Sequence, residues 1–458
     1  MKKLATLLLA AGMIVAASAP ASAVDVKMNG EYVFTFISGQ RIDSADNYDR
    51  AGQRLRLGMT FTASENLSGY VQMQAGIGAE TTDYDWGTTN NAKTNLGIRQ
   101  AYIDWLIPQT TVTIRMGKQL VGLPEDAFGK NAIMHPGLNS RDGVVLSTPV
   151  TDWLDVTALW VRAGYNNEWT DDQGTDVTYD DVVYDYDNDT SRANKSDVFA
   201  VSAAMKFDGF SITPYAVYGS IDDGANKPYP NNDGGFAGSG DAYWFGVTSA
   251  MNYFDPFVLK LSGAYGGVAY DASRLFDRSG WYVQAKASYR TAYGTPVLGA
   301  WYGSGDDSDS KAIHQNWIPS VGGRFHPTFN FAPGEYGLFD PQSTAHHSIA
   351  GTWGIQAGIE DVSFLADLTH AFTVTMFRGT NSSKWADAEN PIAYMTSSDT
   401  VVEFNLSSTY QIYKNLAANL ELAYLINEFD KADHSSFARK NDMGDDAWSA
   451  ALTFAYKF

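Results

Sequence analysis

The chain has no cysteine among its 458 residues. A disulfide framework, a thiolate metal site and a cysteine nucleophile are therefore excluded. Beyond residue 23 the chain also has no apolar run of about 20 residues, the length that a membrane-spanning helix requires. Its mean hydropathy is only −0.24. These absences exclude a helical membrane protein and any fold held together by cysteine chemistry.

Basic residues are scarce relative to acidic ones. The chain has 32 Lys and Arg against 52 Asp and Glu, which gives a formal net charge of −20 at pH 7. So acidic a surface repels a phosphate backbone, which disfavours nucleic acid as a partner. Aromatic residues, in contrast, make up 14% of the chain. Aromatic girdles at the two interfaces of a transmembrane β-barrel would account for this excess.

The first 23 residues have the pattern of a secretory signal peptide. Lys2 and Lys3 precede an apolar run over residues 4–17, and Ala21-Ser22-Ala23 supplies a small-residue cleavage pattern. We expect cleavage after Ala23, which leaves residues 24–458 as one mature domain. The alternative is an uncleaved N-terminal membrane helix, and either interpretation implies export.

The other end of the chain alternates strictly between two kinds of side chain. Apolar and mostly aromatic residues stand at every second position, namely Trp448, Ala450, Leu452, Phe454, Tyr456 and Phe458. A period of two over eleven residues is longer than a typical soluble strand and suits a tilted strand that crosses a bilayer. The alternative is the closing strand of a soluble β-sandwich.

Similar strands recur along the chain in pairs, joined alternately by tight turns and long polar loops. Eight turns are expected at 64–67, 107–109, 148–152, 207–209, 253–256, 292–295, 360–361 and 413–415. Nine longer loops are expected at 38–51, 80–94, 120–142, 164–196, 221–240, 271–279, 304–347, 379–398 and 430–446. Short periplasmic turns and longer external loops are typical of outer-membrane barrels.

These 17 connections predict an all-β fold, a transmembrane antiparallel β-barrel of 18 strands. An even number places both termini on the periplasmic side, where the first and last strands can pair. Lipid demands such closure, because an open sheet edge has no water to bond with there. The alternative count is 16, if segment 143–148, or 210–219 with its Pro214, is not a full strand.

Strand parity predicts which charged side chains face the interior. Between Leu55, Leu57 and Met59 on the lipid side, Arg54 and Arg56 face inward. The same argument turns further residues into the lumen, namely Arg115, Lys206, Lys260, Lys286, Arg290 and Glu421. A charged interior in a barrel of this size indicates an aqueous channel rather than a packed core.

Several short motifs support a resemblance to a known family. They are Glu65-Asn66-Leu67-Ser68-Gly69-Tyr70, Arg99-Gln100-Ala101-Tyr102, Gly117-Lys118-Gln119 and the terminal Phe458. The whole mature chain resembles the trimeric porins of Gram-negative bacteria, and most closely the outer-membrane homotrimeric porins of sulfate-reducing bacteria. The resemblance implies an outer-membrane homotrimer surrounded by lipid and lipopolysaccharide. It also implies that the barrel-assembly machinery reads the terminal strand with Phe454, Tyr456 and Phe458.

The resemblance further implies that the third external loop, residues 120–142, folds inward and narrows the pore. Its acidic residues Glu125, Asp126 and Asp142 would then oppose a basic wall made by Arg54, Arg56, Arg99 and Arg115. Opposed charges put a transverse field across the constriction, which orients polar solutes. The alternatives are that these arginines brace the wall by pairing with acidic residues of neighbouring strands, and that Glu125 and Asp126 are solvated loop residues.

One parity conflict concerns the strand that carries Arg99. If Arg99 faces the lumen, Gln100 and Asp104 face outward, where polar groups are costly in lipid. A protein partner at that face, as in a trimer interface, would remove the cost. The alternative is a β-bulge that reverses the parity within the strand.

The fourth loop is strongly acidic over residues 168–189 and carries no Lys or Arg there. Asp185, Asp187 and Asp189 have the spacing that opens a calcium loop, but Thr190 and Ser196 stand where an EF-hand needs Gly and Glu. We expect a solvated loop, with loosely bound Ca²⁺, or divalent ions shared with lipopolysaccharide phosphates, as the alternative. No other metal site and no cofactor is expected.

Catalysis is not expected, because no histidine has a catalytic spacing to a nucleophile. The seven histidines are His135, His314, His326, His346, His347, His370 and His434. We therefore predict a porin that passes small hydrophilic solutes and ions passively, with a weak preference for anions at the constriction. A substrate-specific channel of the maltoporin type, for a sugar or an anion, is the alternative. Its aromatic track could come from Trp317, Phe325, Phe329, Phe331, Tyr336 and Phe339, which could equally pack their loop onto the barrel. A third possibility is a structural or adhesive surface protein.

Overall fold

The computed structural model describes residues 24–40, 47–76, 96–135, 140–164, 196–221, 239–270, 277–323, 325, 327, 349–386, 394–434 and 446–458. The signal peptide expected at residues 1–23 and the acidic loop expected at 168–189 lie outside these residues. Phe329, Phe331, Tyr336 and Phe339 of the seventh loop also lie outside them. No helix of the described residues is long and apolar enough to cross a membrane.

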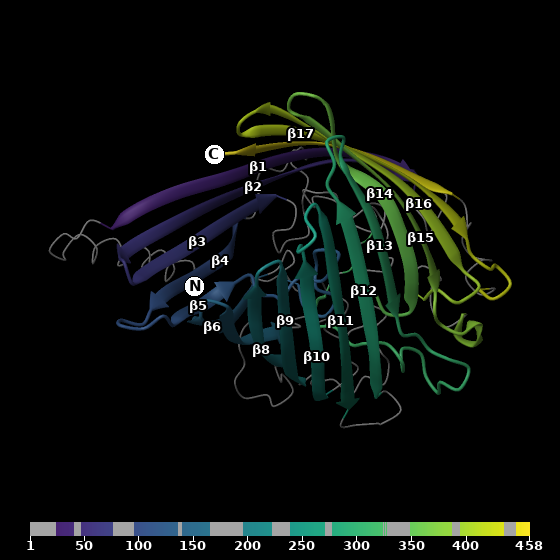
Figure 1. The fold of residues 1–458 in the computed structure, drawn as a ribbon, viewed down its shortest axis with the longest axis horizontal. Helices are drawn as coiled ribbons and strands as arrows, with labels where there is room; N and C mark the ends of the chain where they lie inside the picture. Colours follow the sequence, from purple (N-terminus) through teal and green to yellow (C-terminus); the bar gives the residue numbers. More distant parts are fainter. Residues whose placement is uncertain are drawn as a thin grey trace, which may run out of the picture.

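The described residues form one antiparallel sheet of 18 strands in which every strand pairs with the next in the chain (Figure 1). Pairing of β1 with β18 closes the sheet into a barrel. The strands are β1 (Asp25–Gln40), β2 (Asn47–Ser64), β3 (Leu67–Gly76), β4 (Leu96–Leu106), β5 (Thr113–Gln119), β6 (Arg141–Thr151), β7 (Leu154–Gly164), β8 (Ser196–Phe207), β9 (Phe210–Ile221), β10 (Gly240–Met251), β11 (Phe257–Tyr270), β12 (Arg278–Tyr289), β13 (Thr295–Gly303), β14 (Thr352–Leu365), β15 (Leu368–Gly379), β16 (Thr400–Tyr413), β17 (Leu416–Glu428) and β18 (Ala447–Lys457). A short 3-10 turn, η3 (Ser383–Trp385), lies between β15 and β16.

The prediction of 18 strands is confirmed, and the count of 16 is wrong. Both doubtful segments are full strands, β6 and β9. Pro214 fits into β9 because the pairing of β9 with β8 skips it. Ser202 of β8 pairs with Tyr215, and the next pair is Met205 with Ile212. On the other side of β9, Pro214 pairs with Val247 of β10. The strand therefore tolerates a residue that has no backbone N–H to donate.

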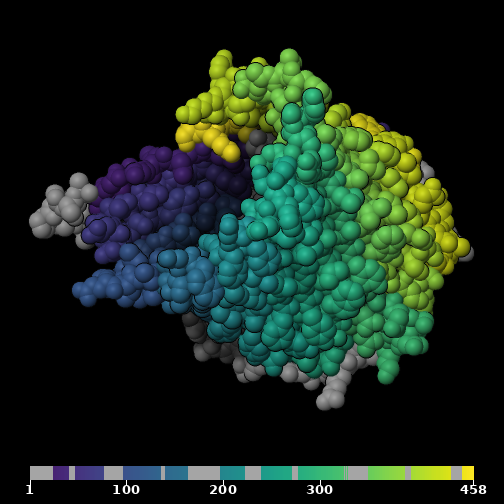
Figure 2. Space-filling model, viewed as in Figure 1, coloured from purple at the N-terminus to yellow at the C-terminus, as the bar shows by residue number. Residues whose placement is uncertain are grey.

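Alternation along each strand separates an apolar exterior from the interior, as the sequence predicts. On β12 the outward side chains of Trp281 and Val283 are 43% and 50% exposed, whereas the inward Tyr282 and Gln284 are 1% and 3% exposed. The same alternation holds on β18, where Ser449 and Thr453 are buried inside. The space-filling view shows a deep recess between the purple and blue strands β1–β5 and the teal and green strands (Figure 2).

The C-terminal aromatic residue, Phe458, extends the pairing of β1 with β18, where the sheet closes; this closing pair of strands is called the seam. The Phe458 N–H donates to the Gly30 carbonyl at 3.0 Å, and the Gly30 N–H donates to the Phe458 carbonyl at 2.7 Å. A Cβ atom on Gly30 would lie 2.2 Å from the Phe458 ring, so the ring rests directly on the glycine. Inside the barrel, the hydroxyl groups of Thr35 and Thr453 are 2.8 Å apart across the same seam. Recognition of this strand by the assembly machinery stays a prediction.

Two of the expected turns differ from the structure. The turn expected at 148–152 lies slightly later, because β6 continues to Thr151 and β7 begins at Leu154. The polar pair Glu360-Asp361 is no turn, because β14 continues through it with register shifts on both sides of Val362. Asp361 has φ +58°, which identifies a β-bulge. Bulges and turns both favour short polar residues at positive φ, so the sequence alone confused the two.

Replacing Gly30 by Ala should destabilise the closed barrel. The new methyl group would displace the Phe458 ring from the seam, and overpacking of this kind costs about 1–3 kcal/mol. The matched control is Gly69→Ala on β3, where a Cβ atom meets nothing closer than the Tyr102 carbonyl at 3.8 Å. The temperature at which the refolded protein changes its mobility in a detergent gel should fall for G30A and not for G69A. Equal transition temperatures for the two variants would contradict the role of Phe458 in stabilising the pairing of β1 with β18.

Candidate functional site: the lumen and its constriction

The third loop, described over residues 120–135 and 140, folds into the barrel and binds the wall formed by β9–β13. Its Asp126 carboxylate accepts hydrogen bonds from the Tyr282 hydroxyl at 2.8 Å and from the Ala132 N–H at 2.9 Å. The next N–H group of the loop, on Ala127, donates to the Ser262 hydroxyl of β11 at 3.0 Å. The loop is therefore held by its own backbone and by one buried acid, which confirms the expected inward fold.

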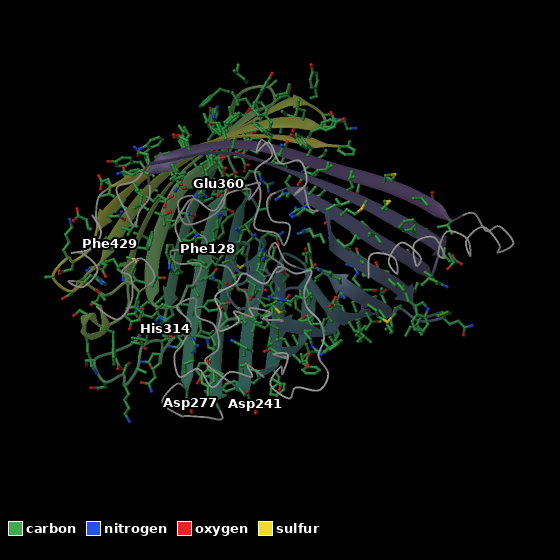
Figure 3. All side chains as sticks on the ribbon, turned by 180° about the vertical axis from the view of Figure 1, so that it is seen from behind. Phe128, Asp241, Asp277, His314, Glu360 and Phe429 are labelled. Carbon is green, nitrogen blue, oxygen red and sulfur yellow. The ribbon has the colours of Figure 1, made fainter. Side chains whose placement is uncertain are left out.

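Aromatic packing adds to these polar contacts. The Phe128 ring meets Trp301 and Phe325 edge-on, at centroid distances of 5.7 and 5.6 Å. From behind, Phe128 appears between Glu360 near one end of the strands and Asp277 near the other (Figure 3). The loop thus reaches deep into the lumen, and its apolar residues Ile133 and Met134 are fully buried there.

The seventh loop, which follows β13, packs beside the third loop. The Val321 N–H donates to the Ile133 carbonyl at 2.7 Å, and the His135 N–H donates to the Gly322 carbonyl at 3.2 Å. Trp317 and Phe325 of this loop are only 4% and 2% exposed. These two aromatic residues therefore pack the loop onto the barrel and do not form an open sugar track.

Three of the predicted wall arginines gather on the opposite side, on β2 and β4. Arg54 donates to Glu31 at 2.9 Å, and an Arg56 nitrogen lies 3.9 Å from the same carboxylate oxygen. Arg56 also donates to Gln74, and Arg99 donates to Gln72, each at 2.7 Å. Among the described residues, Glu31 is the one carboxylate that forms an ion pair with this cluster, so three guanidinium groups face a single acid.

Arg99 reaches the cluster because β4 carries a bulge. Gln72 pairs with Gln100, but the next residue of β3, Met73, pairs with Ile98, so Arg99 is the inserted residue. Gln100 is only 9% exposed and donates to Gln72 at 3.0 Å. The prediction that Gln100 and Asp104 face lipid is therefore wrong, and the alternative, a bulge that reverses parity, is confirmed.

Arg115 faces inward but does not join the three arginines. It donates twice to Asp104 on β4, at 2.7 and 2.8 Å, and its guanidinium carbon lies 4.1 Å from the centre of the Tyr102 ring. A doubly hydrogen-bonded pair of this kind braces neighbouring strands. Arg115 is thus placed as a wall brace, the alternative that the sequence had left open.

The acidic side of the expected constriction also differs from the prediction. Asp126 is 3% exposed and points to β12, away from the arginines. Asp142 belongs to β6, where the inward position is taken by the buried Gly143, so its side chain faces outward opposite Lys118. Glu125 remains exposed on the loop. Of the three expected acids, only Glu125 is available to solute, and the acid beside the arginines is Glu31.

The remaining predicted lumen residues lie around the wall. Lys206 forms an ion pair with Asp155, and Lys286 forms one with Glu360, at 2.7 and 2.9 Å. Lys260 stands directly opposite Lys286 in the register, and Glu421 faces inward at 8% exposure. Arg290 follows the last residue of β12 and is exposed, so strand alternation does not assign it to the lumen.

Sequence reasoning missed Glu31 and Glu360 as partners of these cations. Glu31 follows the same parity as the inward Val33 and Thr35, so its face could have been predicted from β1. Glu360 could not, because the bulge beside it hid the continuation of the strand. Among the histidines, His434 is held by Asp399 at 2.8 Å and by the Ala386 carbonyl at 2.7 Å. No group of three or more metal-ligating residues occurs in the part of the chain that the structure describes.

No protein-family model and no curated protein matches the chain. Solved structures, in contrast, are similar over almost the full length of both chains. OpdQ of Pseudomonas aeruginosa is 14% identical, with 95% of this chain and 98% of that chain covered and a TM-score of 0.52. OccAB2 of Acinetobacter baumannii is 12% identical, with 95% and 98% covered and a TM-score of 0.56.

The outer membrane protein OpdK of Pseudomonas aeruginosa is 11% identical, with 94% and 98% covered and a TM-score of 0.55. OpdK has also been solved with vanillate. At these identities the likeness shows the fold alone, a closed outer-membrane β-barrel. The closer resemblance to porins of sulfate-reducing bacteria stays a prediction.

Lowering the pH should strengthen the attachment of the third loop to the barrel wall through Asp126. Burial raises the pKa of Asp126 to about 6 from its ordinary 3.8. A raised carboxyl pKa means that the packed loop favours the protonated form. The contact of Asp126 with the wall therefore stabilises the packed loop fully below about pH 4. This stabilising free energy decreases by up to about 3 kcal/mol as the pH rises through 6.

Hydrogen exchange of the loop amides at residues 127–134 in refolded protein would measure this attachment. Exchange, corrected for its intrinsic pH dependence, should be faster at pH 8 than at pH 5 for the native chain. The variant Asp126→Asn keeps an oxygen that can accept from Tyr282 and Ala132 but cannot ionise. It should lose the pH dependence, and a D126N profile that still changes between pH 5 and pH 8 would assign the effect to another group.

Proposed function

We propose that this chain forms a water-filled channel in the outer membrane, through which small hydrophilic solutes and ions diffuse passively. One observation carries the proposal: a closed barrel of 18 strands has an apolar exterior and a charged interior, and two loops narrow that interior from one side. A barrel of this strand number is too wide for side chains to fill. The outer-membrane fold of the similar structures supports the location.

The arginine cluster sets the ionic preference of this channel. Among the described residues Arg54 and Arg56 pair with Glu31 and Arg99 donates to Gln72, so this cluster gives the wall opposite the third loop a net positive charge. Each excess positive charge about 10 Å from the path stabilises an anion and destabilises a cation by about 0.4 kcal/mol in water-like dielectric, which changes the anion-to-cation ratio about fourfold. Acidic loops at the mouth affect the ionic preference less, because salt screens their charges beyond about 8–10 Å.

Reversal potentials in planar bilayers test the ionic preference. Across a salt gradient the native channel should prefer anions, and Arg56→Gln and Arg99→Gln should each reduce the anion-to-cation permeability ratio by roughly fourfold. The matched control is Arg162→Gln, because Arg162 pairs with Asp197 on the outer face of β7 and β8 at 3.0 Å. A lack of conductance would contradict the channel itself, whereas unchanged ratios would contradict only the role of the arginines.

A substrate-specific channel is the second candidate, and the observation that favours it is again the basic wall. An organic anion could dock its carboxylate at Arg56 and Arg99, beside the buried Arg54. Saturable uptake of such an anion into liposomes would favour this candidate, whereas linear, size-limited flux would favour the general porin. A sugar-specific channel finds less support, because Trp317 and Phe325 are buried.

The assembly follows from the resemblance rather than from the lumen. We infer a homotrimer, in contact with outer-membrane lipid and lipopolysaccharide and inserted by the barrel-assembly machinery. No cofactor and no catalytic step is part of the proposal. The possible Ca²⁺ at residues 168–189 concerns residues outside the described ones.

A further inference from the structure

His434 is buried between two loops, and each of its ring nitrogens faces a hydrogen-bond acceptor. It belongs to the ninth loop, which follows β17, and the residue is 1% exposed. Nδ1 lies 2.7 Å from the carbonyl oxygen of Ala386, and Nε2 lies 2.8 Å from Oδ2 of Asp399, both in the eighth loop. A neutral imidazole has one N–H, whereas an imidazolium has two. The ring can therefore donate to both acceptors only when it is protonated.

Further donors hold the carboxylate of Asp399 in its ionised form. Its Oδ2 also accepts from the N–H and the hydroxyl group of Thr396, at 2.7 and 2.8 Å. Its Oδ1 accepts from the Asp430 N–H at 2.9 Å. Hydrogen bonds to a carboxylate favour its charged form. The proton between His434 and Asp399 therefore belongs to the imidazole, and the contact is an ion pair.

The other charged groups near His434 also favour a protonated ring. In the ninth loop, the His434 N–H donates to the Asp430 carbonyl at 3.1 Å, and the charge of Asp433 attracts an imidazolium. Lys431 of the same loop is exposed. In the eighth loop, Lys384 donates to two carbonyl groups of the seventh loop, at 3.2 and 3.0 Å. The acidic groups thus act on the ring, while the two lysines are directed elsewhere.

This ion pair joins two loops that are separate in the sequence. The eighth loop is described over residues 380–386 and 394–399, and the ninth over 429–434 and 446. Three hydrogen bonds connect described residues of the two loops, and each involves His434 or Asp399. The eighth loop is in turn fixed to the seventh, because the Tyr394 hydroxyl donates to Asp306 at 2.6 Å. The ninth loop is therefore attached to a fixed support through a titratable pair.

We infer that His434 is a pH-dependent latch, which holds the ninth loop to Ala386 and Asp399 of the eighth loop while the imidazole is protonated. Loss of one proton leaves a single N–H for two acceptors. One of the two buried oxygens then faces a ring nitrogen that cannot donate to it, which is unfavourable. The ninth loop separates from the eighth at this point as a result. The inference goes beyond the proposed channel and does not depend on conduction.

The pKa directions of the two partners agree with this geometry. Burial lowers the pKa of His434, but the hydrogen bond and charge of Asp399 outweigh burial and raise it above the ordinary 6.5. Burial raises the pKa of Asp399, but its hydrogen bonds from His434 and Thr396 outweigh burial and lower it below the ordinary 3.8. The histidine therefore stabilises the closed latch fully below about pH 6.5, and this contribution is lost as the pH rises through the raised pKa. The aspartate contributes fully above about pH 4.

Hydrogen exchange in refolded protein tests the latch at residues 394–399 and 429–434. After correction for the intrinsic pH dependence, the native chain should exchange about threefold or more faster at pH 8.5 than at pH 5.5 in both segments. The variant His434→Gln can donate one hydrogen bond but cannot ionise, so its exchange should be fast at both pH values. The matched control is His370→Gln on β15, where the ring bonds to the Ser408 hydroxyl at 2.8 Å. This control should keep the native difference.

Nuclear magnetic resonance of histidine labelled at Cε1 gives a second measurement. The resonance that H434Q lacks should be more than half protonated at pH 6.5 and should lose its proton only at higher pH. A ring that is mostly neutral at pH 6.5 would overturn the inference. So would an H434Q protein that keeps the native pH difference in exchange. Native protein without that difference would overturn it with no variant at all.

Discussion

Backbone hydrogen bonding is the constraint on which the rest of this structure depends. Each strand within hydrocarbon must pair all of its N–H and C=O groups, and a sheet can do so only if its first and last strands meet. Here β1 and β18 pair from Glu31↔Lys457 to Gly39↔Ser449, and the terminal Phe458 continues the ladder to Gly30. Closure fixes the number of strands as even and places both ends of the chain on one side.

Once the sheet is closed, the two faces of each strand meet different surroundings. Outside, apolar residues such as Phe36, Val283 and Leu452 meet lipid. Inside, the space is too wide for side chains alone, so two loops fill part of it. The third and seventh loops bond to each other and to β9–β13, and the apolar cluster around Trp301 holds them there. Among the described residues this filling lies against β9–β13, opposite the arginines of β2 and β4.

This asymmetry also explains how the charges are arranged. Asp126 is buried with Tyr282, Ala132 and Gln284 all donating to one of its carboxyl oxygens, Oδ2, and it serves to hold the loop. Arg54 is buried and bonds to Glu31, whereas Arg56 and Arg99 are half-buried and donate to the amide oxygens of Gln74 and Gln72.

The sequence by itself determined the strands, their number and the facing of most charged residues. Alternation with a period of two is a local property, and it correctly placed Arg54, Arg56, Lys286 and Glu421 inside the barrel. Only the tertiary structure decided where this period breaks, as at Arg99 and Asp361, because a bulge depends on the register of the neighbouring strand. It also decided that Asp126 is an anchor and that Asp142 lies outside. The Asp126 carboxylate shows its role only through the partners that folding brings to it, and two of these, Tyr282 and Gln284, are more than 150 residues away in the sequence.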